Sequence, residues 1–214
     1  MLEDITGEEI KRQFKTNSTL RFVSIFVGAL VLIVLGYFLY RQYIWGPANE
    51  KSMDSYWEGL NYAKMDSTAT ALDQLQGVVK KHDGKIGGEV AQFVYARQLM
   101  VEGNFKKALK ELESVNVSDT YISVCSVGLQ GDCYSELGDY EKAANIYLKA
   151  AEMNDNDYTT PMYLFKAGLC AEEIKNFEKA AECYQRISDD YPGYASQKQI
   201  EKYLSRASNK TTSA

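Results

Sequence analysis

The chain of 214 residues has a single histidine, His82, and none of its four cysteines are spaced as Cys-x-x-Cys. One histidine excludes metal sites built on a histidine pair, and the cysteine spacing fits neither a zinc site nor a thioredoxin-like redox pair. A Gly-x-Ser-x-Gly elbow and a phosphate-binding P-loop are missing as well. His82 lies in the turn-like stretch Lys80 to Lys85. We therefore predict no enzymatic activity, no metal and no cofactor.

The four cysteines all fall within segments of helical pattern: Cys125, Cys133, Cys170 and Cys183. Free cysteine is commonly a small, buried, apolar side chain, and this is the interpretation we prefer. A disulfide between neighbouring helices stays open in an oxidising compartment, although the sequence does not define its connectivity.

A concentrated basic stripe is also missing. The chain has 24 basic and 29 acidic residues, and the part after Arg41 has 19 basic and 25 acidic residues. Nucleic acid is excluded as a partner, because binding to phosphates requires a concentrated basic face. Acidic pairs such as Glu172-Glu173 are interpreted as solvated helix faces.

Charge is absent from Phe22 to Tyr40. At 1.5 Å per residue this stretch gives about 28 Å of helix, enough to cross the core of a bilayer. We predict a transmembrane helix over residues 20–43, after a cytoplasmic tail of residues 1–19. The alternative is a secretory signal peptide cleaved near Gly46, but the apolar stretch exceeds the usual length of roughly 7–15 residues.

Basic residues are more frequent before this helix than after it. Four precede it and two follow it closely: Lys11, Arg12, Lys15 and Arg21, then Arg41 and Lys51. By the positive-inside rule, the N-terminus is expected in the cytoplasm and the C-terminal part outside. In a bacterium this predicts a single-pass protein of the inner (cytoplasmic) membrane with a periplasmic domain.

Three copies of one pattern follow, over residues 89–122, 124–157 and 161–194. Small residues recur at the eighth and twentieth positions of each copy: Ala96, Gly131, Gly168 and Ala108, Ala143, Ala180. Two of the copies have a Gly-polar-aromatic turn between these positions, Gly103-Asn104-Phe105 and Gly138-Asp139-Tyr140. This spacing matches the tetratricopeptide repeat (TPR), a helix–turn–helix unit.

A weaker copy is predicted over residues 52–86, with Gly59, Ala71 and Leu75 in the corresponding positions. We expect a closing helix at 195–207 and a disordered tail at 208–214. The predicted fold is all-α: the transmembrane helix, then a TPR-like helical solenoid of about three to four helix pairs over residues 49–207.

A TPR stack offers a concave surface made by the first helix of each pair, and such surfaces bind segments of other proteins. The expected protein-binding groove is apolar at one end and acidic toward the other. Together with Cys125 it comprises Val90, Phe93, Arg97, Met100, Val101, Gly128, Asp132, Ser135, Glu136, Met162, Phe165, Leu169, Glu172 and Glu173. The alternative for some of these residues, above all Val90 and Phe93, is that an adjacent helix pair covers them and they do not line the groove.

The layout of a short basic tail, one membrane helix, a helical segment with Tyr56-Trp57, and TPR units ending at Tyr191-Pro192 resembles the YfgM-type family of bacterial inner-membrane TPR proteins. The resemblance implies an ancillary subunit of the Sec translocon, working beside a periplasmic foldase and chaperones. Its partners would be translocon subunits, that foldase and exported client proteins.

Three functions are compared with these features of the sequence. The first is a membrane-anchored TPR adaptor that assists Sec-dependent export or periplasmic chaperone networks. The second is a TPR scaffold of another cell-envelope assembly or secretion complex. The third, an envelope enzyme with a helical domain, is disfavoured by the missing motifs. The partner, the oligomeric state and the redox state of the cysteines do not follow from the sequence.

Overall fold

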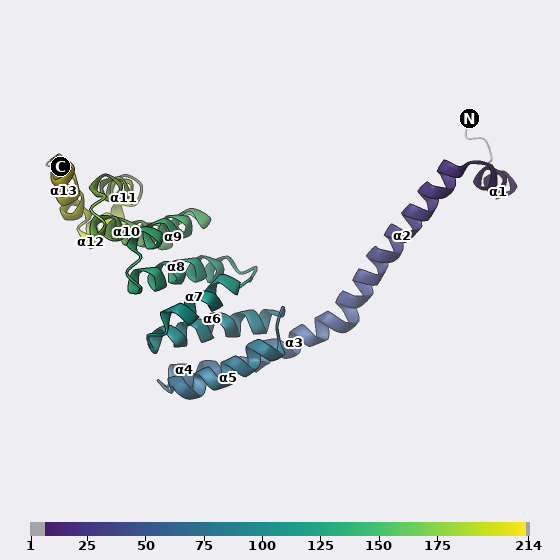
Figure 1. Ribbon diagram of the computed structural model, residues 1–214, viewed down its shortest axis with the longest axis horizontal. Coiled ribbons are helices and arrows are strands. Elements are labelled where there is room, and N and C mark those ends of the chain that lie inside the picture. Colours follow the sequence, from purple (N-terminus) through teal and green to yellow (C-terminus); the bar gives the residue numbers. More distant parts are fainter. Residues whose placement is uncertain (1–6, 213–214) are drawn as a thin grey trace. The chain divides into compact units, whose positions relative to one another are not determined.

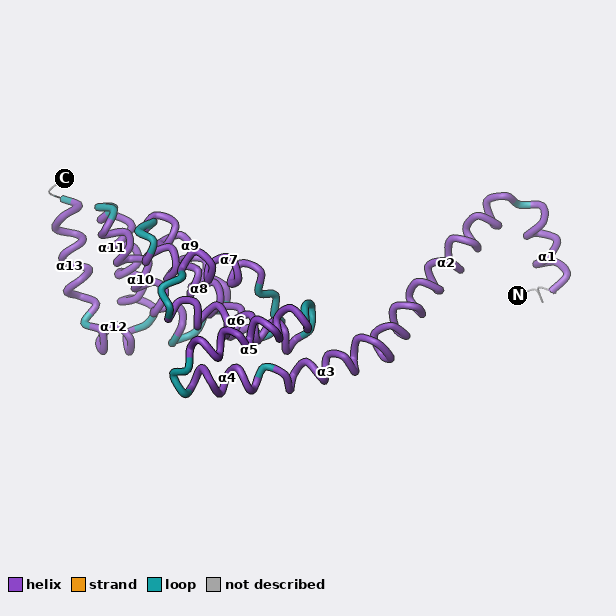
Figure 2. The backbone as a smooth tube through the Cα atoms, turned by 60° about the horizontal axis from the view of Figure 1, so that its bottom comes forward, coloured by secondary structure: helices purple, strands orange, loops and turns teal. Residues whose placement is uncertain are grey.

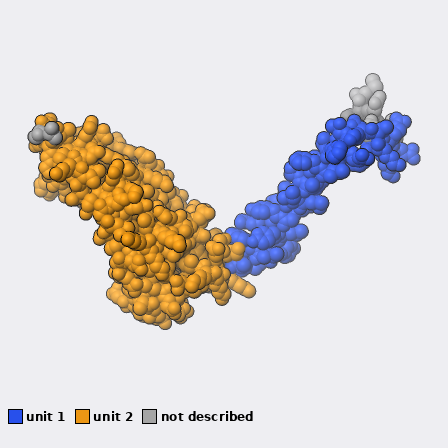
Figure 3. All heavy atoms as spheres, viewed as in Figure 1, with its two compact units in different colours: residues 1–50 blue, residues 51–214 orange. Residues whose placement is uncertain are grey.

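The computed structural model describes residues 7–212, and within that range the regular elements are helices. The chain divides into two compact units, residues 1–50 and residues 51–214 (Figure 3). Because the regular elements of the described residues are helices, the expected all-α class is confirmed.

The first unit contains α1 (Gly7–Thr16) and α2 (Ser18–Tyr40). Asn17 separates them: its backbone is extended, and its side-chain Oδ1 caps α2 by accepting a hydrogen bond from the Leu20 N–H at 3.2 Å. None of the residues of α2 is buried within the structure. By length and composition, α2 is long and apolar enough to cross a membrane.

A short π-helical turn, η1 (Arg41–Trp45), continues α2 into α3 (Gly46–Ser55). Pro47 explains this turn, because a proline inside a helix lacks an N–H and its ring collides with the carbonyl four residues earlier. The wider turn is closed by a bond from the Gly46 N–H to the Arg41 carbonyl, five residues back. The Arg41 guanidinium also lies over the Trp45 ring, 4.2 Å from its centroid.

The second unit is a stack of four helix pairs in chain order (Figures 1 and 2). The pairs are α4 (Trp57–Lys64) with α5 (Thr68–Lys81), α6 (Ile86–Val101) with α7 (Phe105–Ser114), α8 (Thr120–Glu136) with α9 (Tyr140–Met153), and α10 (Thr159–Glu173) with α11 (Phe177–Asp190). Each helix packs on the next one along the chain. The predicted TPR-like solenoid is confirmed.

Every pair turns in the same way. The fifteenth position, counted from Ser52, Glu89, Val124 and Pro161, has a positive φ in each copy: Asp66 54°, Gly103 73°, Gly138 80° and Lys175 60°. The next residue donates its N–H to the carbonyl five residues earlier, as from Asn104 to Leu99 at 2.8 Å and from Asp139 to Tyr134 at 2.9 Å. This left-handed closure ends the first helix and starts the second.

Small residues allow the two helices of a pair to approach closely. The alanines at the twentieth position, Ala71, Ala108, Ala143 and Ala180, are completely buried. At the eighth position, a Cβ on Gly131 would lie 2.6 Å from the Tyr147 ring, and a Cβ on Gly168 would lie 2.5 Å from the Tyr184 ring. Glycine is therefore required wherever a tyrosine occupies the twenty-fourth position.

Two further helices close the stack, α12 (Pro192–Lys198) and α13 (Ile200–Thr211). The buried side chains of α13, Ile200 and Ala207, lie against the core, and the Tyr203 ring meets the Phe165 ring edge to face at 4.8 Å. These contacts cover the apolar end of the last repeat, as a solenoid requires. The helix continues to Thr211, so part of the segment 208–214, expected to be disordered, is helical because α13 extends past Ala207.

Candidate protein-binding surface

The first helices of successive pairs lie side by side and run in the same direction. Helix α6 contacts both α4 and α8. Between α8 and α10, a Cβ on Gly128 would meet the Tyr163 ring, and the Lys166 ammonium lies 2.6 Å from the Asp132 carboxylate. These contacts join equivalent stretches of the two helices, so residues at equivalent helix ends form rows along the stack.

Exposed large apolar side chains of the repeats are concentrated at the two ends of these first helices. An N-terminal row contains Ile86, Tyr121 and Tyr158, exposed by 42%, 62% and 68%. A C-terminal row contains Val101, Leu137 and Ile174, exposed by 70%, 40% and 40%, and Met65 occupies the same place in the first pair. Of the exposed large apolar residues between positions 65 and 190, Met153 alone belongs to a second helix.

The N-terminal row is aromatic in its second half, where Tyr121 and Tyr158 are both exposed. The neighbouring Cys125 thiol raises the pKa of Tyr121, and Tyr158 adds to this effect. Burial raises the pKa of Tyr194 on α12, and the same Tyr158 contributes there too. Tyr158 and Tyr194 line the same cleft, and the three tyrosines follow one another in the sequence at intervals of 37 and 36 residues.

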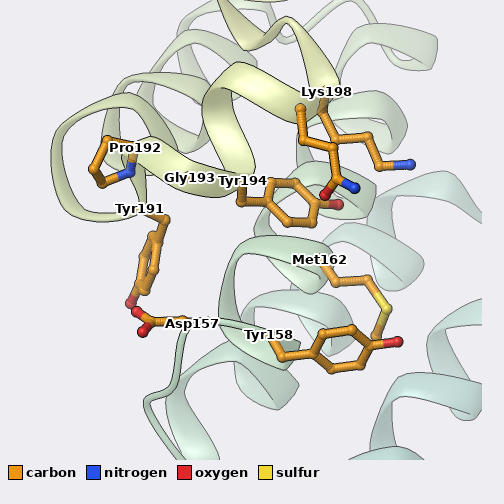
Figure 4. A pocket seen from close by; sticks show the side chains of 9 residues that line it. Asp157, Tyr158, Met162, Tyr191, Pro192, Gly193, Tyr194 and Lys198 are labelled. Atoms are coloured by element: carbon orange, nitrogen blue, oxygen red, sulfur yellow. The ribbon is translucent and has the colours of Figure 1, made fainter.

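The row leads into an open cleft of about 720 Å³ between α10 and α12. Met162 of α10 and Tyr158, the residue directly before α10, line it on one side, and Tyr194 of α12 lies opposite them (Figure 4). Asp157 and Lys198 add one charge of each sign to the wall. The cleft is therefore shaped to hold an apolar or aromatic side chain with polar atoms nearby.

The apolar residues predicted for the groove are mostly half-buried on α6 and α10. This group comprises Val90, Phe93, Met100, Met162, Phe165 and Leu169. Phe93, Met100, Met162 and Phe165 pack partly against the core, so they present only part of their surface. Arg97 is exposed, and its guanidinium lies 6.0 Å from the centroid of the Phe93 ring.

Gly128 does not line the groove as predicted. It is buried, and a Cβ at this position would lie 2.2 Å from the Tyr163 ring of α10. The absence of a side chain here lets two first helices approach, so Gly128 is a packing residue.

The acidic half of the predicted groove separates into two kinds of residue. Asp132 accepts hydrogen bonds from the Tyr147 hydroxyl and the Lys166 ammonium, and Glu172 pairs with Arg206 of α13 at 2.8 Å. Both carboxylates therefore join neighbouring helices. Burial, with Asp132 adding to it, raises the pKa of Tyr147 well above its usual range.

Glu136 lies four residues after Asp132, and Glu173 lies directly after Glu172. Both glutamates are exposed. No ion pair among residues 7–212 involves either of them. Ser135 is half-buried beside Glu136, where it lies close enough to Cys170 to hydrogen-bond. The exposed glutamates, not the paired carboxylates, are the free charges of this face.

The cysteines are free thiols, and three of them are buried. Burial raises the pKa of Cys133 to about 12 and that of Cys183 to about 11, which keeps both protonated and unreactive at neutral pH. Cys125 is half-buried next to the N-terminal row.

Sequence reasoning missed the tyrosines of the N-terminal row. Their spacing carries a signal: Ile86, Tyr121 and Tyr158 each stand three residues before the start of a repeat copy. These residues lie outside the repeat pattern, because the first helices begin before its first position.

A stack of helix pairs with exposed apolar side chains at the ends of its first helices belongs to the class of helical-repeat interaction domains. Within this class, two segments match the tetratricopeptide repeat family, residues 127–157 and residues 163–194. The chain therefore contains tetratricopeptide repeats, and such repeats form a scaffold for protein–protein interaction. The TPR fold is generally non-enzymatic.

A TPR repeat-containing protein of Treponema pallidum (strain Nichols) is 25% identical over 135 residues, which make up 61% of this chain and 56% of that protein. The chain thus spans little more than half the length of this relative. A tetratricopeptide repeat protein from Parabacteroides merdae ATCC 43184 superposes with a TM-score of 0.59 at 15% identity, covering 76% of this chain and 61% of that one. MamA protein superposes with a TM-score of 0.55 at 20% identity, covering 77% and 92%. The two structures show the same fold.

Proposed function

We propose that this protein is a membrane-anchored TPR adaptor that binds other proteins at the outer face of the bacterial cytoplasmic membrane. The observation that carries the binding role is the distribution of exposed apolar side chains. In the repeats they lie almost entirely at the ends of the first helices, where Tyr121 and Tyr158 are exposed and Tyr158 lines the cleft together with Tyr194. An apolar surface of this kind marks a site of protein interaction.

The anchor in this proposal is α2. Its run of apolar residues is exposed in the structure, which is favourable in lipid and unfavourable in water. The basic residues before α2 support an orientation with the N-terminus in the cytoplasm and the repeats in the periplasm. A single crossing then holds the interaction surface near the membrane.

The partners we propose are translocon subunits, a periplasmic foldase and exported clients. This assignment rests on the resemblance to the YfgM-type family in layout. A scaffold of another envelope assembly or secretion complex is the second candidate, since it uses the same anchor and the same face. The two differ in the complex with which the protein purifies.

Purification of the full-length chain from native membranes in mild detergent, with mass spectrometry of the bound proteins, tests both candidates. We expect translocon and foldase subunits to be captured by the native chain and depleted with the Tyr121→Ala/Tyr158→Ala variant. Met153→Ala is the matched control, because it removes an exposed apolar side chain from a second helix. Capture of a different envelope complex would favour the general scaffold.

Orientation is tested separately with a reporter that is active only outside the cytoplasm, fused after the C-terminal residue. We expect activity. An inactive reporter on a stable fusion would place the repeats in the cytoplasm and exclude exported clients as partners.

A further inference from the structure

The C-terminal ends of three first helices combine an exposed apolar side chain with an exposed glutamate. The adjacent pairs are Val101-Glu102, Glu136-Leu137 and Glu173-Ile174. They occupy the thirteenth and fourteenth positions of each copy, directly before the left-handed turn residue. We call these six residues the acidic-apolar edge.

The fold does not account for the glutamates of this edge. A helix ends in partial negative charge, so a carboxylate there is unfavourable and a cation is favourable. Helices α6, α8 and α10 have no basic residue in their last turn, whereas α4 ends with Lys64. A glutamate stands at the end of all three helices, and only after α10 does a cation, Lys175, directly follow the pair.

Within the described residues no ion pair compensates these charges. The Lys107 ammonium hydrogen-bonds the Tyr95 hydroxyl at 2.6 Å, and this bond raises the pKa of Lys107, with Glu111 and Glu102 adding to the effect; Lys107 forms no ion pair with Glu102. Asp132 and Glu172 on the same helices do have basic partners, Lys166 and Arg206. The edge thus keeps its carboxylates in water, beside apolar surface that is also in water.

We propose that the acidic-apolar edge docks a basic segment of a partner protein that also carries apolar residues. Charge complementarity selects this occupant: a lysine or arginine would meet a carboxylate and the negative end of a helix at each of three steps. The neighbouring Val101, Leu137 and Ile174 would contact the partner's apolar side chains. This inference rests on the proposed use of the first-helix face for protein binding and names the chemistry of what binds there.

An extended segment is the probe that we choose for this edge. Packed helices lie about 8–10 Å apart, and a polyproline II segment rises about 9.3 Å per turn of three residues. A peptide with one lysine in every three residues therefore offers one cation for each step of the edge. Its lysines fall on one face.

The test uses the full-length chain in non-ionic detergent and a fluorescent peptide of five Lys-Val-Pro repeats, followed by anisotropy. We expect the peptide to bind and the affinity to fall as salt rises from about 50 to about 300 mM. The triple variant Glu102→Gln/Glu136→Gln/Glu173→Gln should weaken binding by roughly 3- to 100-fold, as expected for three exposed ion pairs. A peptide of Glu-Val-Pro repeats should not bind.

A second triple variant, Glu113→Gln/Glu152→Gln/Glu182→Gln, changes the net charge equally on the second helices, where all three glutamates are exposed. It should retain the native affinity within about twofold. Equal losses with the two triples, or no binding of the Lys-Val-Pro peptide, would overturn the inference. Folding is checked by thermal unfolding, in which the edge triple should be more stable by about 1–4 °C because unfavourable charges leave three helix ends.

Peptide binding and the capture of envelope proteins can fail independently. Peptide binding without any captured envelope complex would support the edge and refute the adaptor role proposed above. Capture of translocon subunits by a chain that does not bind the peptide would support the adaptor role and refute the edge as a docking site.

Discussion

Side chains in the interior of each helix pair are closely packed, whereas side chains at the ends of its first helix are exposed. Inside, a small residue faces a large one, as Gly131 faces Tyr147 and Gly168 faces Tyr184, and nothing else fits. At the helix ends, apolar and acidic side chains remain exposed in every repeat. The repeat pattern therefore specifies the stack, while surface positions outside the packing contacts are available for partners. Substitutions in the two regions should therefore have very different effects.

Gly131→Leu should have the largest effect. A Cβ at this position already lies 2.6 Å from the Tyr147 ring, and the remaining atoms of leucine have no space in the pair. We expect the free energy of unfolding to fall by about 3 kcal/mol or more, as for severe overpacking of a core. Gly77→Leu is the control, because nothing lies within 4 Å of a Cβ there and leucine favours the helix by up to about 1 kcal/mol. Chemical denaturation of both variants measures the contrast, and equal stabilities would refute the packing argument.

Asp132→Ala should have an intermediate effect. It leaves the buried Tyr147 hydroxyl and the Lys166 ammonium without their shared acceptor. Because the Asp132 and Lys166 side chains are partly exposed, we expect the free energy of unfolding to fall by only about 1–2 kcal/mol. Glu136→Ala, four residues further along α8, should change stability by less than about 0.5 kcal/mol. If urea unfolding showed the reverse order, the division between joining and free carboxylates would be wrong.

Substitutions of the turn residues should change the stability least, and the change should have opposite signs in two repeats. Lys175 has a φ of 60°, a conformation that costs a residue with a Cβ about 1 kcal/mol relative to glycine. Lys175→Gly should therefore stabilise the domain by about 0.5–1 kcal/mol, and Gly138→Lys should destabilise it by a similar amount. Nothing lies within 4 Å of a Cβ at Gly138, so the backbone alone is tested. Thermal unfolding at constant pH measures both, and shifts of the same sign would contradict the common turn geometry.

The sequence predicted the helical repeats because their requirements are local and periodic. Small residues at the eighth and twentieth positions, and a left-handed residue between the helices, can be recognised without knowing the neighbours. The weak first copy follows the same turn geometry, with Asp66 in the position that glycine occupies at Gly103 and Gly138.

The groove was harder to predict, since its composition depends on which residues the next pair covers. Gly128 was expected at the surface and is buried under Tyr163. Asp132 and Glu172 were expected as groove charges and serve instead as partners of Lys166 and Arg206, 34 residues further along the chain. Tyr121 and Tyr158 were overlooked because they precede the repeat pattern.

By itself, the sequence determined the order of the helices, their turns and a stretch of apolar residues long enough to cross a membrane. These features follow from side-chain size, backbone preference and hydrophobicity counted along the chain. The tertiary structure alone decided which charged residues of the first helices are neutralised by a neighbour and which remain free, and which aromatic rings meet across repeats. Those outcomes depend on the distance between residues of successive helix pairs, which is fixed only when the small residues bring the helices into contact.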